Sequence, residues 1–159
     1  MKMVALLAVA VISLDQVTKW IVVARLPVGI RIDLVDGILA LTLVMNPGLA
    51  FGILGNVPAA WRWLVAALSL VALVVLARVA LRVLPAGTSV DVVAIGLIFG
   101  GAVGNLIDRA RYGAVVDFID VYYRTYHWPA FNAADSAITI GVTILALRLV
   151  GRRSAPSAP

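Results

Sequence analysis

Two aspartates with apolar neighbours are the strongest candidates for chemistry in this sequence. Asp117 lies in the apolar stretch 114–119, and Asp135 follows residues 131–134 where a long apolar segment begins. Two adjacent carboxyl groups resist double ionisation, so one of them keeps a proton near neutral pH. The ionised partner can take a proton from water while the protonated one polarises a carbonyl group. If the two meet, they predict peptide hydrolysis without a metal, a cofactor or a covalent intermediate.

Each aspartate also has a purely structural interpretation. Asp117 fits a solvated loop carboxylate, although its apolar neighbours argue against free solvation. Asp135 fits the third position of a helix whose N-cap is Asn132, a variant of the capping box. The capping role does not exclude catalysis, because a side chain in the first turn can also face the interior of a helix bundle. The segment between the two aspartates is long enough for the chain to return to the same depth.

Asn105, Asp108 and Arg109 form a second polar group. Their spacing of three and four residues places them on one face of a helix. We expect Arg109 to pair with Asp108 and to be able to hold a further carboxylate. The glycine-rich run 99–104 before them allows another helix to approach closely, which is a packing role.

Asp15 and Lys19 are spaced by four residues in the first apolar segment. On a helix they share a face and can form an ion pair. One interpretation is that the pair only neutralises two charges at the end of a membrane span, whereas a functional interpretation has one of them help to hold a bound chain. Both alternatives stay open at this point.

Other hydrolytic chemistries lack their residues. The chain has no Cys and a single histidine, His127, and none of its eight acidic residues is a glutamate. It therefore has no thiolate nucleophile, no site of several histidines and no HExxH helix, and it contains no Gly-x-Ser-x-Gly motif. We expect neither a metal nor a cofactor.

The composition is that of an integral membrane protein. Of 159 residues, 63% are hydrophobic and 13% charged, and the mean hydropathy is +1.06. A soluble domain of this size cannot bury so much apolar surface, so a soluble enzyme and a disordered chain are excluded. The sequence pI of about 10.2 does not indicate a nucleic-acid partner, because the basic residues are dispersed.

Four segments are long and apolar enough to cross a bilayer, which takes about 20 helical residues. They lie at about 3–24, 61–83, 90–107 and 133–150. We therefore predict an all-α membrane protein, a four-helix bundle forming one integral domain over 1–153, with a disordered tail at 154–159.

An even number of spans places both termini on one side, together with the short basic loop near Arg82, which favours the cytoplasm. All four Trp and all four Tyr fall toward the opposite side. Most of the unusual polar residues lie there too, so we expect the site at the extracytoplasmic face of a multi-pass protein.

Two long loops lie on that face, at about 25–60 and 110–131. Residues 30–34 alternate apolar and polar, Asp36-Gly37 supplies a turn, and 38–44 resemble a second strand, which together predict a β-hairpin. Residues 49–54 are apolar and predict a helix along the membrane surface. The hairpin and this helix are candidates for a lid over a laterally entering substrate.

Two other functions fit a small polar membrane bundle. A transporter or proton relay uses intramembrane polar residues, but it predicts them at mid-span and on both faces. A structural subunit of a larger complex uses small-residue faces for docking and predicts no activity of the isolated protein.

Five motifs in chain order resemble those of one family, and together they cover nearly the whole chain. They are Asp15-Gln16-Val17-Thr18-Lys19, Asn46-Pro47-Gly48-Leu49-Ala50-Phe51, the run from Gly100 to Arg109, Val115-Val116-Asp117-Phe118-Ile119, and Phe131-Asn132-Ala133-Ala134-Asp135. The family is the bacterial lipoprotein signal peptidase, or type II signal peptidase.

The resemblance implies a four-helix membrane aspartyl protease that removes the signal peptide of a prolipoprotein immediately before its diacylglyceryl-Cys. It implies that Asp117 and Asp135 are the catalytic pair. The residues it implies to bind substrate or to support the pair are Asn46, Gly48, Asn105, Asp108, Arg109, Asn132, Asp15 and Lys19. From it we also expect a monomer in the bacterial cytoplasmic membrane, with the prolipoprotein and membrane lipid as partners and no nucleic acid.

Overall fold

The structure is a computed structural model and describes residues 2–48 and 62–153. The surface helix predicted at 49–54 and the tail at 154–159 lie outside the described residues. Four long helices confirm the predicted bundle: α1 (Lys2–Arg25), α2 (Arg62–Val83), α3 (Ser89–Tyr112) and α4 (Ala133–Arg153). A short 3-10 turn, η3 (Leu84–Ala86), follows α2. Each helix is long enough, at 1.5 Å per residue, to cross about 30 Å of hydrocarbon.

The third helix runs past the end that the hydropathy pattern predicted at about residue 107. It continues to Tyr112, and its polar residues Asn105, Asp108 and Arg109 are all buried inside the protein, whereas residues 110–112 are exposed. The helix ends at Gly113, whose φ of 66° places it in the left-handed region that glycine tolerates. Hydropathy marks where a helix leaves the hydrocarbon, and the helix itself does not have to end there.

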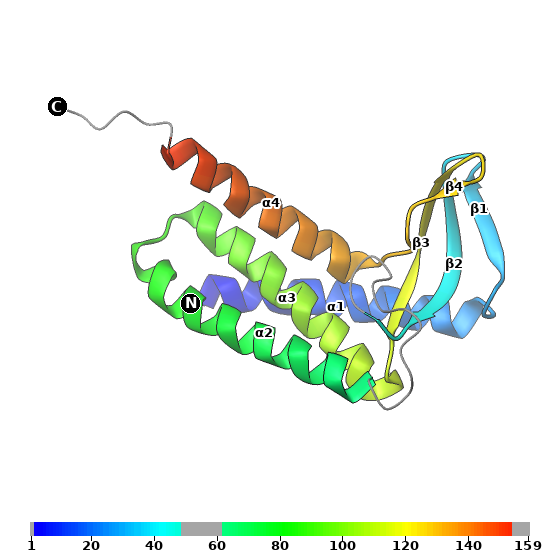
Figure 1. The fold of residues 1–159 in the computed structure, drawn as a ribbon, viewed down its shortest axis with the longest axis horizontal. Helices are drawn as coiled ribbons and strands as arrows, with labels where there is room; N and C mark the ends of the chain where they lie inside the picture. Colours follow the sequence, from blue (N-terminus) through cyan, green and yellow to red (C-terminus); the bar gives the residue numbers. More distant parts are fainter. Residues whose placement is uncertain (1, 49–61, 154–159) are drawn as a thin grey trace.

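α3 occupies the centre of the bundle and packs against each of the other three helices (Figure 1). Glycines along α3 allow this. A Cβ added at Gly100 would lie 2.9 Å from the backbone oxygen of Ala8, and one at Gly104 would lie 2.5 Å from Oδ2 of Asp15. The close helix approach predicted from the glycine-rich run is therefore present, and at Gly104 it also makes room for a carboxylate.

A small antiparallel sheet stands at one end of the bundle, with strand order β1-β2-β3-β4. Its first two strands, β1 (Arg31–Val35) and β2 (Leu39–Asn46), are the predicted hairpin, with Gly37 at a φ of 78° in the turn. The other two, β3 (Val115–Tyr123) and β4 (Tyr126–His127), lie in the segment that the sequence interpretation assigned to an irregular loop. The nine residues of β3 are mostly β-branched or aromatic, a strand signal that the sequence interpretation overlooked.

The sheet is joined to the bundle by an apolar cluster at its base. Val22 and Leu26, at the end of α1 and just beyond it, pack with Leu43, Val116 and Phe118 of the sheet. The start of α1, the end of α4 and the turn between α2 and α3 all lie at the opposite end of the molecule (Figure 1). This arrangement places β3 beside the first turn of α4.

Candidate active site

The two aspartates singled out by the sequence line one cavity of about 340 Å³. Asp117 reaches it from β3 and Asp135 from the first turn of α4. Most of the remaining wall is apolar and comes from α2, α3 and α4. The other lining residues are Asn46, Ser69, Ala72, Leu73, Leu76, Ile98, Ala102, Asn105, Arg109, Val115 and Ile138.

Asp117 is buried, with 2% of its surface exposed. Its Oδ1 accepts a hydrogen bond from Nδ2 of Asn132 at 2.7 Å, and its Oδ2 accepts one from Nδ2 of Asn46 at 3.0 Å. Burial raises the pKa of Asp117 to about 7, the two amide donors oppose the rise, and the charge of Asp135 adds to it. At neutral pH Asp117 is therefore poised between its protonated and ionised forms.

Asp135 is the third residue of α4, and it takes part in the predicted capping box. Its backbone N–H donates to Oδ1 of Asn132 at 2.9 Å, and its Oδ2 accepts from the backbone N–H of Asn132 at 3.3 Å. Its Oδ1 accepts a third bond, from Nδ2 of Asn105 at 2.8 Å. The structural interpretation of Asp135 is thus confirmed, and the same side chain also faces the cavity.

Asn132 connects the two carboxyl groups. The side chain is fully buried, with its Oδ1 held by the backbone of Asp135 and its Nδ2 donating to Asp117. The same Nδ2 donates to Oδ1 of Asn105 at 3.2 Å, and Nδ2 of Asn105 donates in turn to Oδ1 of Asp135. Together with Asn46, three asparagines therefore present amide donors to the two carboxylates from different parts of the fold.

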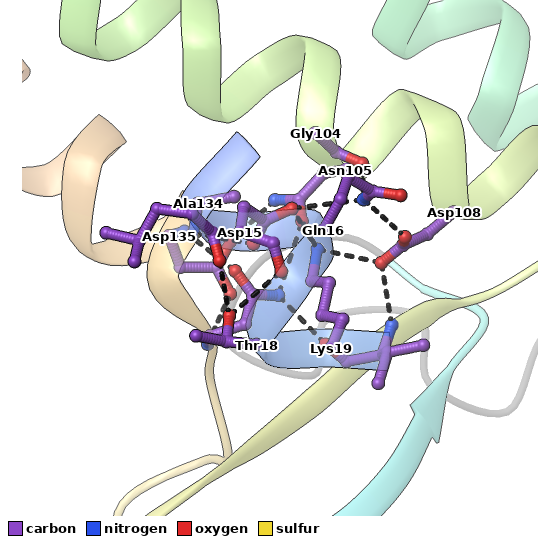
Figure 2. Close-up of polar contacts among 12 residues, drawn as sticks. Asp15, Gln16, Thr18, Lys19, Gly104, Asn105, Asp108, Ala134 and Asp135 are labelled. Atoms are coloured by element: carbon purple, nitrogen blue, oxygen red, sulfur yellow. Dashed lines mark hydrogen bonds and ion pairs between the residues drawn. The ribbon is translucent and has the colours of Figure 1, made fainter. Parts of the chain in front are cut away.

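A buried ion cluster of Asp15, Lys19 and Asp108 contacts Asn105 (Figure 2). Nζ of Lys19 is 2.8 Å from Oδ2 of Asp15 and 2.7 Å from Oδ2 of Asp108. Lys19 also donates to Oδ1 of Asn105 at 3.0 Å, and Oδ1 of Asp15 accepts from the backbone N–H of Ala134 at 3.0 Å. The cluster therefore ties α1, α3 and the start of α4 together.

The expected pairing of Arg109 with Asp108 is wrong. Asp108 takes Lys19 as its ion partner and accepts a second bond from the backbone N–H of Val116. Arg109 instead lines the cavity, and its Nη2 donates to the backbone oxygen of Gly48 at 2.9 Å. Asp108 is directed toward α1, so the two neighbours on α3 face different partners.

Comparison with known proteins identifies the chain's family. The family model of signal peptidase (SPase) II matches residues 7–151. The chain belongs to the signal peptidase II family. A lipoprotein signal peptidase of Geobacter sulfurreducens is 44% identical over 145 residues, which cover 90% of this chain and 89% of that protein. One from Symbiobacterium thermophilum is 42% identical over 144 residues, 91% of each chain.

Two solved structures share the fold of this chain. A bacterial membrane enzyme structure at 2.3 Å resolution superposes with a TM-score of 0.79 at 34% identity, covering 100% of this chain and 94% of that one. A second, at 1.9 Å resolution, gives a TM-score of 0.73 at 33% identity and covers 94% and 93% of the two chains. The four-helix architecture of this signal peptidase II chain is therefore shared with membrane enzymes.

All ten site residues inferred from the sequence of this signal peptidase II chain gather at one end of the bundle. Five line the cavity: Asp117, Asp135, Asn46, Asn105 and Arg109. Two more support them from outside its wall: Gly48 donates its N–H to Oδ1 of Asn46, and Asn132 bridges the carboxyl groups. The remaining three, Asp15, Lys19 and Asp108, form the ion cluster.

Sequence reasoning missed Gln16. Its Nε2 donates to Oδ1 of Asp108 at 2.9 Å, to Oδ2 of Asp15 at 3.2 Å and to the backbone oxygen of Gly104 at 3.2 Å. A glutamine in a membrane span needs polar partners, so its position beside Asp15 was a usable signal. A second cavity, of about 320 Å³, shares the Asp135 wall with the first, and no sequence pattern pointed to it.

Proposed function

We propose that this chain is a membrane aspartic endopeptidase that removes the signal peptide from diacylglyceryl-modified prolipoproteins, cleaving immediately before the lipidated Cys. Proteins that share 42–44% of its sequence over nine-tenths of their length are lipoprotein signal peptidases. The observation that carries the proposal is a pair of carboxyl groups, the buried Asp117 and the half-buried Asp135, that line one cavity of a membrane bundle. The two act as the catalytic residues.

The mechanism follows from one proton shared by the two carboxyl groups. A water molecule bound between them loses a proton to the ionised carboxylate as its oxygen attacks the scissile carbonyl carbon. The protonated carboxyl donates its proton to the carbonyl oxygen, which gives a neutral tetrahedral intermediate. The proton taken from water then passes to the amide nitrogen, the carbon–nitrogen bond breaks, and the new carboxyl group returns a proton to the pair. The pair ends with one proton, as it began.

The surrounding residues prepare this state. Burial of Asp117 raises its pKa to about 7, so a single proton stays on the pair at neutral pH. The amides of Asn46, Asn105 and Asn132 donate to carboxylate oxygens and keep both groups aimed at the cavity. The guanidinium of Arg109 lines the same cavity and is placed to hold a substrate carbonyl.

We also propose that the site lies at the extracytoplasmic face of the bacterial cytoplasmic membrane and that both chain ends lie in the cytoplasm. Three exposed tryptophans support this: Trp20 in the last turns of α1, Trp63 in the first turn of α2, and Trp128 shortly before α4. These helix ends lie at the end of the bundle that carries the sheet (Figure 1), and aromatic side chains favour the headgroup layer. Arg82 lies at the other end, beside the short turn between α2 and α3. The chain acts as a single integral domain, as a monomer in contact with membrane lipid.

The direct test uses the purified full-length chain and a prolipoprotein that carries diacylglyceryl-Cys, with the unlipidated precursor as the substrate control. We expect cleavage of the lipidated form only. Asp117→Asn and Asp135→Asn should each abolish cleavage while the protein still inserts. Asp120→Asn is the matched control, because Asp120 lies on the same strand but pairs with His127 and Arg31 outside the cavity. Full activity of either cavity variant would overturn the catalytic assignment, and equal cleavage of both precursors would overturn the lipid requirement.

A further inference from the structure

The side-chain amide of Asn105 connects the ion cluster to Asp135, one of the two proposed catalytic residues (Figure 2). Its Oδ1 accepts from Nζ of Lys19 at 3.0 Å and from Nδ2 of Asn132 at 3.2 Å. Its Nδ2 donates to Oδ1 of Asp135 at 2.8 Å. One end of this amide therefore faces donors, and the other end faces a carboxylate.

The neighbours of Asn105 permit only this orientation. If the amide were rotated by about 180°, its NH₂ group would face the ammonium of Lys19, which has three donors and no acceptor. Its oxygen would then face the carboxylate oxygen of Asp135. Both contacts would be repulsive, and at the buried ammonium of Lys19 no water replaces the lost hydrogen bond. Lys19 thus decides that Asn105 acts as a donor toward Asp135.

Lys19 is itself held in place. Its side chain is 3% exposed and is fixed by two carboxylates, that of Asp15 on its own helix and that of Asp108 on α3. Asp15 is fixed in turn by the backbone N–H of Ala134 in the first turn of α4. The ammonium therefore has a defined position relative to the helix that carries Asp135, and Lys19 is absent from the cavity wall.

We propose that Lys19 is a positioning residue for the peptidase reaction: its buried ammonium fixes the amide of Asn105 with the NH₂ group toward Asp135, and so sets that carboxylate as a hydrogen-bond acceptor facing the cavity. This inference rests on the proposed function. It assigns Lys19 a role beyond neutralising Asp15, and it explains why a charge cluster lies directly behind the cavity wall.

The charge of Lys19 acts on the pair as well. Asp117 shares its surroundings with Asp135 of α4, Arg109 of α3 and Lys19 of α1, and the charge of Lys19 lowers the pKa of Asp117 against the larger effect of burial. Removing this charge should therefore raise the pKa of Asp117, and the alkaline limb of the pH–rate profile should move to higher pH. Removing the charge of Asp108, which partly neutralises Lys19, should move this limb to lower pH.

The test compares Lys19→Met, which removes donor and charge, with Lys19→Gln, which keeps a neutral N–H donor. For Lys19→Met we expect kcat for the lipidated precursor to fall roughly 10–100-fold, the loss typical of a group that orients a reactive one. KM should stay unchanged, because Lys19 does not line the cavity. Lys19→Gln should recover part of kcat and show the same alkaline shift.

Asp108→Asn is the matched control, since it removes a charge from the same cluster but leaves the bond from Lys19 to Asn105. We expect it to shift the pH profile in the opposite direction. In an Asn105→Ala background, Lys19→Met should cause little further loss of kcat, because the amide through which it acts is gone.

A merely structural role for Lys19 would reduce the amount of folded enzyme and leave the pH profile unchanged. The inference would therefore be overturned by two results together. The Lys19 variants would have the pH profile of the wild type, and Lys19→Met would reduce kcat as much in the Asn105→Ala background as it does in the wild type. If Lys19→Met does not insert into the membrane, Lys19→Gln tests the predicted shift of the alkaline limb to higher pH. Asp108→Asn tests the predicted shift to lower pH. Failure of the wild type to cleave the lipidated precursor would instead reject the proposed function, so the two outcomes are distinct.

Discussion

The raised pKa of Asp117 predicts that the unfolding free energy of the variant Asp117→Asn increases relative to that of the wild type as the pH rises. The folded state holds the Asp117 proton up to about pH 7, whereas the ordinary pKa of the side chain is 3.8. Between these two values the unfolded chain has released the proton and the folded protein still binds it. Because the folded state then binds more protons, rising pH favours unfolding of the wild type over this window. An asparagine side chain at this position does not titrate, so the variant lacks this loss.

The magnitude follows from the two pKa values. Each pKa unit corresponds to about 1.36 kcal/mol, so the difference between about 7 and 3.8 is worth roughly 4 kcal/mol of unfolding free energy once the pH exceeds both values. The substitution also has a cost that does not depend on pH. The new NH₂ group must face Asn46 or Asn132, both of which present donors to this position. The variant can therefore be less stable than the wild type in acid and still gain on it as the pH rises.

The assay is equilibrium unfolding in mixed detergent micelles at a series of pH values from about 4 to about 8. The informative quantity is the difference in unfolding free energy between Asp117→Asn and the wild type, because the titration of other groups cancels in it. Asp36→Asn, in the exposed turn of the hairpin, controls for the loss of one negative charge. A difference for Asp117→Asn that stays constant within about 1 kcal/mol across this range would refute the argument that burial keeps Asp117 protonated.

Three further substitutions test separate parts of the fold. Asn46→Leu removes a donor that lowers the pKa of Asp117, so the alkaline limb of the pH–rate profile should move to higher pH and kcat should fall. Gly104→Ala would place a Cβ 2.5 Å from Oδ2 of Asp15, and overpacking of this kind costs about 1–3 kcal/mol, measurable as a lower unfolding midpoint. Arg148→Met removes the ion partner of Asp91, which is buried at the opposite end of the bundle, and it should lower stability by about 1–3 kcal/mol and leave kcat unchanged in the cleavage assay.

The helices were predictable because each is a long apolar run, and the start of α4 was predictable because Asn132 and Asp135 form a local capping pattern. Such signals lie within one continuous segment of the sequence and need no knowledge of the rest of the chain. The end of α3 was not predictable from hydropathy. Asn105, Asp108 and Arg109 near this end are buried, and Asp108 has its ion partner on α1, which is distant in sequence. The environment of these residues therefore depends on packing that a local pattern does not contain.

The candidate site was likewise only partly predictable from the sequence. The residue types were evident, because each acid or amide in an apolar context needs a partner. The choice of partner was not, and Arg109 was assigned to Asp108 because the two are neighbours in sequence. In the folded protein Lys19 competes for the same carboxylate and reaches it from another helix at 2.7 Å. Pairing across elements follows from the helix packing, which the glycines of α3 permit but do not specify.

Strand register explains why a carboxylate just outside the third span comes to line a cavity. Asp117 lies opposite Val44 on β2, and Asn46 is two residues further along the same strand, so it shares the face of Val44 and reaches Asp117 diagonally. A shift of one residue would turn Asp117 to the other face of the sheet and direct Asn46 away from it. The register is interrupted between Leu41 and Val44. Residues 39–41 of β2 therefore pair with β3 in a different register from residues 44–46, which lie at the site. The exposed strand β1 pairs with residues 39–42 of β2, whereas the rows that hold the proposed catalytic geometry lie at residues 44–46, beyond this irregularity.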